Sequence, residues 1–223
     1  MKAAIVTQAG QMPVHADFDA PVATAGHVLI DVEASALSHL TRGRASGSHY
    51  SSSGRFPFVA GVDGVGRRED GTRVYFFGPK APSGGLAQRT LVPEGQCFAI
   101  PDALDAVTAA AMAIPGMSSW AALTERAKFV RGETVLVNGA TGASGRLAVQ
   151  IAKHLGAGKV IATGRHPQTL AGLEAVGADC VVPLGQDEAA LHRALEPHFR
   201  DGVDVVLDYL WGPSAQTLLT GAA

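Results

Sequence analysis

Three small residues form the part of the sequence best suited to chemistry. Ala140, Gly142 and Gly145 match the pattern G-x-G-x-x-G, with alanine in the first place. An apolar run at residues 134–138 precedes them, and apolar residues at helical spacing follow as far as Gly156. This order predicts a strand, a tight turn and a helix whose first N–H groups face the pyrophosphate of a dinucleotide. The residues predicted to hold it are Gly142, Ala143, Ser144 and Gly145. The alternative is a tight turn that serves packing alone.

The end of the following strand, predicted at residues 159–163, selects the cofactor. An NAD site places an acidic residue there, about 20 residues beyond the glycines, to bind the ribose 2′-hydroxyl. This sequence has Gly164, Arg165 and His166 instead. An arginine there can bind a 2′-phosphate through paired, charge-assisted hydrogen bonds, so the sequence predicts NADP(H), with His166 as a weaker contributor. The alternative is that Arg165 is an ordinary solvated arginine.

Composition is that of an ordinary globular protein. The chain has 223 residues, of which 47% are hydrophobic and 17% charged, with a net charge of −2. These values do not favour nucleic acid or an anionic membrane as a partner. No apolar run is expected to reach membrane-spanning length, and the first residues lack the features of a signal peptide. Cys97 and Cys180 lie far apart without a C-x-x-C pattern. We therefore expect a reduced, cytoplasmic protein.

The two parts of the chain differ in pattern, which predicts a β domain at residues 1–101 and an α/β domain at 102–223. In the first, strands are expected at residues 28–32, 73–77 and 86–92, and a polar loop at 44–57. In the second, helices are expected at 105–112, 118–127 and 188–195, and further strands at 180–182 and 203–207. Alternating strands and helices indicate a parallel sheet with helices on both faces. Only four of the usual six strands can be assigned, so this sheet is expected to be incomplete.

Several segments together resemble the medium-chain dehydrogenases/reductases, and within them the zinc-independent quinone oxidoreductases. The segments that carry the resemblance are MKAAIVTQAG, FPFVAGVDGVG, GGLAQRTLVPEGQCFAIPD and GETVLVNGATGASG. The resemblance covers essentially the whole chain, and the glycine turn and Gly61-Val62-Asp63 are its most specific parts. It implies a GroES-like β domain, a Rossmann domain, and hydride transfer from NADPH to a quinone, enone or aldehyde. The family's last two sheet strands are missing from this sequence.

The same resemblance predicts that no metal is bound. Zinc-using relatives have a cysteine soon after the strand that contains Ile30, where this chain reads Ala36-Leu37-Ser38-His39. They have a histidine–glutamate pair where it reads Val62-Asp63, and the four-cysteine lobe is absent. Since a tetrahedral zinc site requires three or four protein ligands held together, none is expected.

Without zinc, hydrogen-bond donors must stabilise the oxyanion that forms on the substrate. Ser38 stands where the family commonly has asparagine, and Tyr50 lies near a family tyrosine, so both are candidate catalytic residues. Ser118 stands where the family often has a threonine near the nicotinamide, although a helix N-cap is an equal alternative. Tyr50 has its own alternative as a simple loop aromatic.

These features predict an NADPH-dependent oxidoreductase that reduces a small electrophile. A homodimer is a further expectation. An enoyl reductase or a zinc-free alcohol dehydrogenase is the nearest alternative enzyme. A module that binds NADP(H) without turnover, as a sensor or partner, is the alternative from another class.

Overall fold

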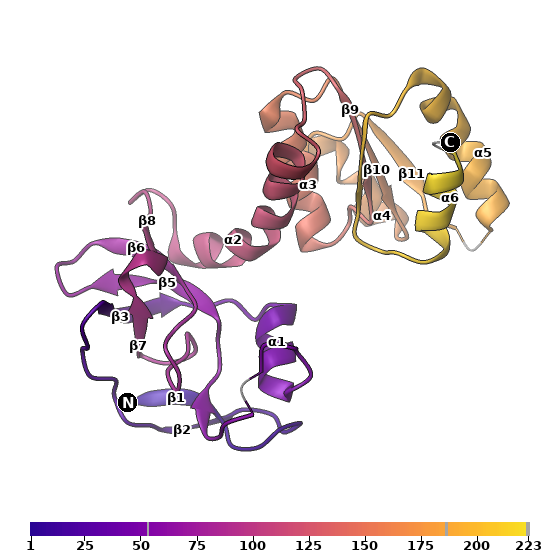
Figure 1. Cartoon of the computed structure of the whole chain (residues 1–223). Coiled ribbons are helices and arrows are strands. Elements are labelled where there is room, and N and C mark those ends of the chain that lie inside the picture. Colours follow the sequence, from indigo (N-terminus) through magenta and orange to yellow (C-terminus); the bar gives the residue numbers. More distant parts are fainter. Residues whose placement is uncertain (53, 186, 222–223) are drawn as a thin grey trace. The chain divides into compact units, whose positions relative to one another are not determined.

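The computed structural model describes residues 1–52, 54–185 and 187–221, and it contains two compact units (Figure 1). These are Met1–Ala113 and Ile114–Ala223, with the boundary inside helix α2 (Ala106–Ala121). The functional division at residue 102 stays a prediction. Ser53, inside the predicted loop, and the last two residues of the second predicted domain lie outside the described residues.

The N-terminal unit is built on two antiparallel sheets. The larger sheet has the strand order β7-β3-β5-β6-β8 and the smaller one β2-β1-β4. The strands are β1 (Lys2–Val6), β2 (Val14–Asp17), β3 (His27–Ala34), β4 (Phe58–Val59), β5 (Asp63–Arg68), β6 (Arg73–Phe77), β7 (Arg89–Pro93) and β8 (Cys97–Ala99), with a 3₁₀ turn at Glu94–Gln96. The larger sheet buries Ile30, Val74, Phe76 and Val92 on one face. The strands predicted at 28–32 and 73–77 are confirmed.

The bounds of two expected elements in this unit need correction. The predicted strand at 86–92 begins only at Arg89, as β7. The predicted loop at 44–57 begins inside a helix, α1 (His39–Ser46). This helix is polar along most of its length and buries only Thr41 and Ala45. Its sequence therefore lacks the apolar periodicity that predicts a helix. Ser38 caps its start, and Gly47, at φ 78°, ends it.

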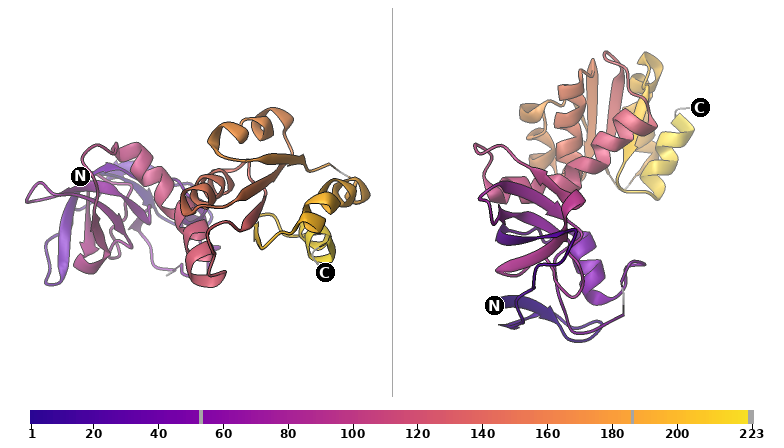
Figure 2. Two further views of the ribbon diagram at one scale, coloured as in Figure 1. Left: turned by 90° about the horizontal axis from the view of Figure 1, so that it is seen from above. Right: turned by 60° about the vertical axis from the view of Figure 1, so that its left-hand side comes forward.

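The C-terminal unit is a four-stranded parallel sheet with the order β11-β10-β9-β12 and helices on both faces (Figure 2). The strands are β9 (Thr134–Asn138), β10 (Lys159–Gly164), β11 (Cys180–Pro183) and β12 (Val205–Asp208). The helices are α3 (Ala143–Leu155), α4 (Pro167–Ala171), α5 (Glu188–Asp201) and α6 (Pro213–Gly221), with a 3₁₀ turn at Glu174–Val176. The predicted α/β class and the four predicted strands are confirmed. The helix expected at 188–195 was too short, because α5 continues through Pro197.

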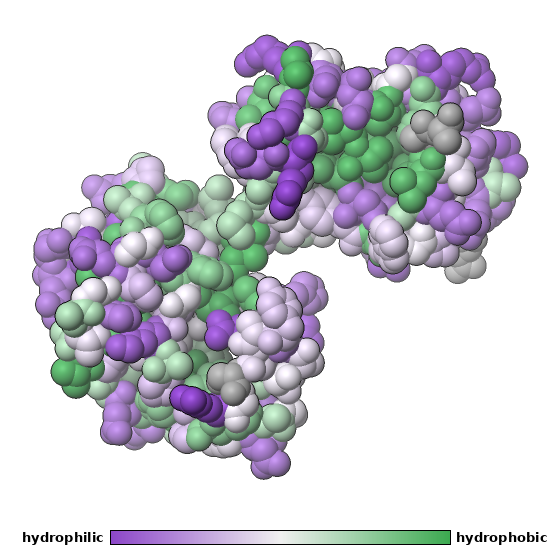
Figure 3. All heavy atoms as spheres, viewed as in Figure 1, coloured by the Kyte–Doolittle hydropathy of each residue, from purple (hydrophilic) through white to green (hydrophobic). Residues whose placement is uncertain are grey.

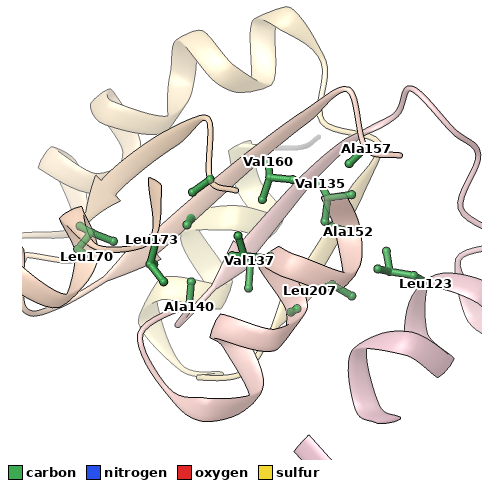
Figure 4. Close-up of a cluster of buried hydrophobic side chains, with 14 residues drawn as sticks. Leu123, Val135, Val137, Ala140, Ala152, Ala157, Val160, Leu170, Leu173 and Leu207 are labelled. Atoms are coloured by element: carbon green, nitrogen blue, oxygen red, sulfur yellow. The ribbon is translucent and has the colours of Figure 1, made fainter. Parts of the chain in front are cut away.

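The core of this unit follows from the alternation of side chains along β9. Val135 and Val137 lie in one buried cluster with Ala148 and Ala152 of α3, as the close-up in Figure 4 shows for most of them. Leu136 belongs to a second cluster, with side chains from α5 and α6. A central parallel strand buried on both faces is apolar throughout, as this one is. Figure 3 shows that apolar residues also reach the surface of this unit between polar margins.

One long helix corrects two further expectations. The separate helices predicted at 105–112 and 118–127 are a single helix, α2, which runs through Pro115 and continues as a π-helical turn at Ala122–Arg126. By length and composition alone, Ala106–Arg126 could span a membrane, with a mean hydropathy of 1.3 and 28% of that window buried. The expectation that no run reaches spanning length was therefore wrong. One such helix is a weak indication, because core helices of other proteins pass the same test.

Candidate functional site

The carboxyl edge of the parallel sheet is the place where this fold can bind a ligand. Strands β9, β10 and β11 follow one another outward in one direction, whereas β12 joins the other side of β9. Connections therefore leave the ends of β9 and β12 in opposite directions. Such a switch point opens a crevice beyond the strand ends, and ligands of open α/β sheets bind there. Asn138 and Asp208 end the two strands at this point.

The glycine turn leads from β9 into α3 at this edge. Gly139 adopts φ +85°, a left-handed conformation that favours glycine, and Gly142 is the N-cap of α3. Gly142 provides no side-chain cap, and the first hydrogen bond of the helix runs from the Arg146 N–H to the Gly142 carbonyl. The N–H groups of the first turn therefore have no partner inside the helix, and the positive end of the helix dipole adds to them.

The two main glycines of the motif have different reasons to be glycine. A Cβ on Gly142 would meet nothing within 4 Å, so open space lies beside it. A Cβ on Gly145 would collide with the backbone of Gly139 and Ala140, at 2.6 Å from the Ala140 Cα. Gly145 is buried and lets the helix pack on the turn, whereas Gly142 leaves room for a ligand to approach the backbone. These two features fit a pyrophosphate at the start of α3.

A buried polar network fixes the turn. The Asn138 side-chain amide donates to Asp208 Oδ1 at 2.6 Å and to Ser214 Oγ at 3.1 Å. Its Oδ1 accepts from Thr163 Oγ1 at 2.7 Å, and Thr163 Oγ1 in turn accepts from the Gly139 N–H at 3.1 Å. Asn138 and Thr163 are fully buried, so these bonds are shielded from water. The network ties the ends of β9, β10 and β12 to the first residue of the turn.

The end of β10 lies against the same turn. A Cβ on Gly164 would collide with the Thr141 side chain, so only glycine allows this approach. Arg165 and His166 follow directly and are exposed. His166 is the N-cap of α4, and its carbonyl accepts from Thr169 Oγ1 at 3.0 Å. The structure therefore brings the predicted cofactor residues of the glycine turn and those after β10 to one edge.

The loop after β12 lies on the other side of the glycine turn, where Leu210 approaches Gly139. Asp208 accepts the N–H groups of Leu210 at 3.2 Å and Trp211 at 3.0 Å. The Leu210 side chain occupies the space beside Gly139. Trp211 has φ +59°, which is unusual for a bulky residue, and 77% of it is exposed.

Ser118 belongs to this region as well, but not as a helix N-cap. It lies within α2 and donates its hydroxyl to the Pro115 carbonyl at 2.9 Å, so the N-cap alternative was wrong. Its Oγ also lies 3.4 Å from the Tyr209 hydroxyl, in the loop after β12. A role of Ser118 near the nicotinamide stays a prediction.

The two catalytic candidates lie in the N-terminal unit, at opposite ends of α1. Ser38 Oγ accepts the Thr41 N–H at 3.1 Å and lies 3.1 Å from Thr41 Oγ1, so it acts as a helix cap. Tyr50 is 94% exposed, and its ring lies against that of His49 in a tilted arrangement with centroids 4.2 Å apart. No contact joins Ser38 to Tyr50 among the described residues. Their catalytic roles stay predictions.

The same unit holds a buried carboxyl group, Asp63, at a position where zinc-using relatives are expected to have a ligand. Asp63 is fully buried and accepts the Tyr75 hydroxyl at 3.0 Å through Oδ2, while Oδ1 has no partner among the described atoms. Burial raises the pKa of Asp63 to about 6, and the bond from Tyr75 partly opposes this. Burial and the neighbouring carboxylate also raise the pKa of Tyr75 well above its usual value.

The sequence did not single out the residues whose contacts depend on strand order. Asn138, Thr163 and Asp208 meet only because β12 pairs with β9 and β10 pairs with its other side. One signal was available: each is a polar residue at or near the end of an apolar strand, and the carboxyl ends of parallel strands meet at one edge. Within the described residues, no group of three or more His, Cys, Asp or Glu side chains could hold a metal ion.

Comparison with known proteins identifies the relatives. A family model described as "Zinc-binding dehydrogenase" matches residues 143–221. A probable NADPH-dependent quinone reductase from Emericella nidulans is 33% identical over 257 residues, which cover 100% of this chain and 71% of that protein. The quinone oxidoreductase of Rattus norvegicus is 31% identical, covering 89% of this chain and 62% of that protein.

A solved structure agrees with these matches. The quinone oxidoreductase of Thermus thermophilus, studied also in complex with NADPH, superimposes with a TM-score of 0.75 at 26% identity. The match covers 99% of this chain and 85% of that one. By contrast, the chain spans under two thirds of the rat relative's length.

Proposed function

Because this chain belongs to the quinone oxidoreductase-like branch of the medium-chain dehydrogenase/reductase superfamily, we propose that it is an NADPH-dependent oxidoreductase of quinones, enones or related carbonyl compounds. Two observations support the cofactor assignment. Open space beside Gly142 faces the uncapped start of α3, and an arginine, not an acid, follows β10. The names of the relatives specify NADPH and quinone, and we extend both to this chain.

The C-terminal unit would hold the cofactor through groups that are already in place. The N–H groups at the start of α3, from Ala143 to Gly145, would bind the pyrophosphate. Arg165 would bind the 2′-phosphate, with His166 beside it. The buried bonds of Asn138 and Thr163 keep the turn rigid, so little ordering accompanies binding. When bound, NADPH supplies the hydride.

The N-terminal unit would supply the hydrogen bond to the substrate oxygen. Of the two candidates, Ser38 already uses its hydroxyl to cap α1. The Tyr50 hydroxyl makes no hydrogen bond within the described residues and is exposed. A phenol hydroxyl can donate a hydrogen bond to a developing oxyanion. We therefore assign to Tyr50 the donation of a hydrogen bond to the substrate oxygen. This role does not require a zinc ion. A cytoplasmic location and a homodimer remain predictions.

Two measurements on the same preparation test this function. The first is titration with NADPH, monitored by energy transfer from tryptophan to the bound nicotinamide. The second is NADPH oxidation with a panel of quinones, enones and aldehydes. We expect saturable binding and turnover with at least one class of electrophile. Binding without turnover on every substrate would favour the sensor alternative, and failure to bind NADPH would refute the proposal.

A further inference from the structure

A cavity lies in the N-terminal unit beside α1. Its volume is about 490 Å³, and it lies between α1, the segment that leads into β4, and the loop at residues 79–83. Neither Ser38 nor Tyr50 lines it. Pockets for small molecules usually have volumes of about 300–1,000 Å³, so this cavity has a suitable size.

The walls of the cavity combine apolar surface with positive charge. Phe56, Phe58 and Val59 contribute apolar side chains, and two arginines, Arg44 and Arg55, line it as well. None of the described residues that line it is acidic. A neutral ligand would leave the Arg44 guanidinium without a partner in a partly desolvated space. The lining therefore favours a ligand that carries a negative charge on an apolar body.

Arg44 is the residue best suited to bind that charge. It lies in the last turn of α1 and is half-buried, and its guanidinium makes no hydrogen bond or ion pair with any described residue. An unpaired guanidinium can bind a carboxylate through two parallel hydrogen bonds. Ser83, also half-buried in the lining, has a hydroxyl without a partner among the described residues. It would supply a further donor.

We propose that this cavity is a binding site for an aromatic or alicyclic carboxylate, with the carboxylate on Arg44 and the ring against Phe56 and Phe58. A carboxylate fits better than a phosphate, because one half-buried arginine and one hydroxyl would leave most of a phosphate dianion unpaired. The site does not depend on the proposed reductase function, since it involves none of the residues assigned to the cofactor or to the reaction.

The test uses 2-naphthoate as the probe and 2-naphthamide as a neutral compound of the same shape, with the full chain and no cofactor. Calorimetric titration should show saturable binding of 2-naphthoate and binding of 2-naphthamide about tenfold weaker or more. Arg44→Gln should weaken 2-naphthoate binding by about ten- to a hundredfold, since a hydrogen bond to a charged group is lost. Arg42→Gln is the matched control, because Arg42 is exposed on the same helix and does not line the cavity.

Ser83→Ala is the second variant, and it should weaken 2-naphthoate binding several-fold even if Arg44→Gln does not fold. Thermal unfolding of each variant shows whether it is folded. Equal affinity for the acid and the amide would overturn the proposal. So would wild-type affinity for 2-naphthoate in both Arg44→Gln and Ser83→Ala, or no saturable binding of 2-naphthoate at all. Because NADPH is absent, none of these outcomes depends on whether the chain is a reductase.

Discussion

Substitutions at Gly142 and Gly145 should separate ligand binding from packing within one turn. Gly142→Val places its side chain in open space, at φ −80° and ψ 172°, a conformation that valine readily adopts. The fold should therefore lose less than about 1 kcal/mol, mainly because valine is a poor N-cap. The side chain would, however, fill the space through which a pyrophosphate approaches α3. Losing one charge-assisted hydrogen bond, about 1.5–3 kcal/mol, weakens NADPH binding by about ten- to a hundredfold.

Gly145→Ala should have the opposite effect. Its Cβ would lie 2.6 Å from the Ala140 Cα and closer still to the Gly139 carbonyl, so backbone must move. Overpacking of this kind costs about 1–3 kcal/mol, and backbone contacts place the cost near the upper end. Alanine is a better helix former than glycine by about 1 kcal/mol, which offsets part of it. The net loss of about 2 kcal/mol corresponds to a fall of about 4–8 °C in Tm.

The assay measures both quantities on both variants, as dissociation constants for NADPH and as thermal unfolding midpoints. Gly142→Val should bind NADPH weakly and have the Tm of the wild type, whereas Gly145→Ala should have a lower Tm. If Gly142→Val binds NADPH with wild-type affinity, the start of α3 is not the pyrophosphate site. If Gly145→Ala is as stable as the wild type, the packing argument is wrong.

Three further predictions concern charge and metal. Arg165→Glu should weaken NADPH binding by about ten- to a hundredfold more than NADH binding, as measured by paired titrations at fixed salt. Equal losses of affinity for the two cofactors would show that Arg165 does not contact the 2′-phosphate. Burial raises the pKa of Asp63 from 3.8 to about 6 in the folded state, so the protonated group contributes to the free energy of unfolding. This contribution is complete below pH 3.8 and is lost as the pH rises through 6. Relative to Asp63→Asn, the wild type should therefore lose about 2–3 kcal/mol of unfolding free energy between pH 4 and pH 7, and parallel curves from chemical denaturation would contradict this. Finally, a chelator should leave NADPH binding and oxidation unchanged; stoichiometric zinc in elemental analysis, lost together with activity, would refute the zinc-free proposal.

The sequence predicted the parallel sheet well because each of its strands is a short apolar run with clear boundaries. It failed where local composition and tertiary structure disagree. Helix α1 was hidden because it is polar and glycine-containing, and it depends on caps and on two buried side chains. Helix α2 was divided in two because Pro115-Gly116 usually interrupts a helix. Here the hydroxyls of Ser118 and Ser119 bond back to carbonyls one turn earlier, and the helix continues.

The candidate site was predictable only in its consecutive part. The glycine turn and Arg165 can be predicted from their spacing in the sequence, because both belong to one βαβ unit. Asn138, Thr163 and Asp208 come from three strands, and their contacts depend on which strands pair. Trp211 could not be singled out either, because its left-handed backbone follows from hydrogen bonds that Asp208 accepts. Pairing and register are long-range properties that local patterns do not determine.

The distribution of charge along the carboxyl edge is a second argument that the cofactor is NADPH. An acid does stand at this edge, but it is Asp208 at the end of β12 and not a residue at the end of β10. Asp208 accepts hydrogen bonds from Asn138, Leu210 and Trp211, so its oxygens are used within the protein. The end of β10 carries Arg165 and His166 instead, both exposed. The acid at this edge therefore holds the β12 loop in place, and positive charge stands at the position where the proposed site would bind a 2′-phosphate.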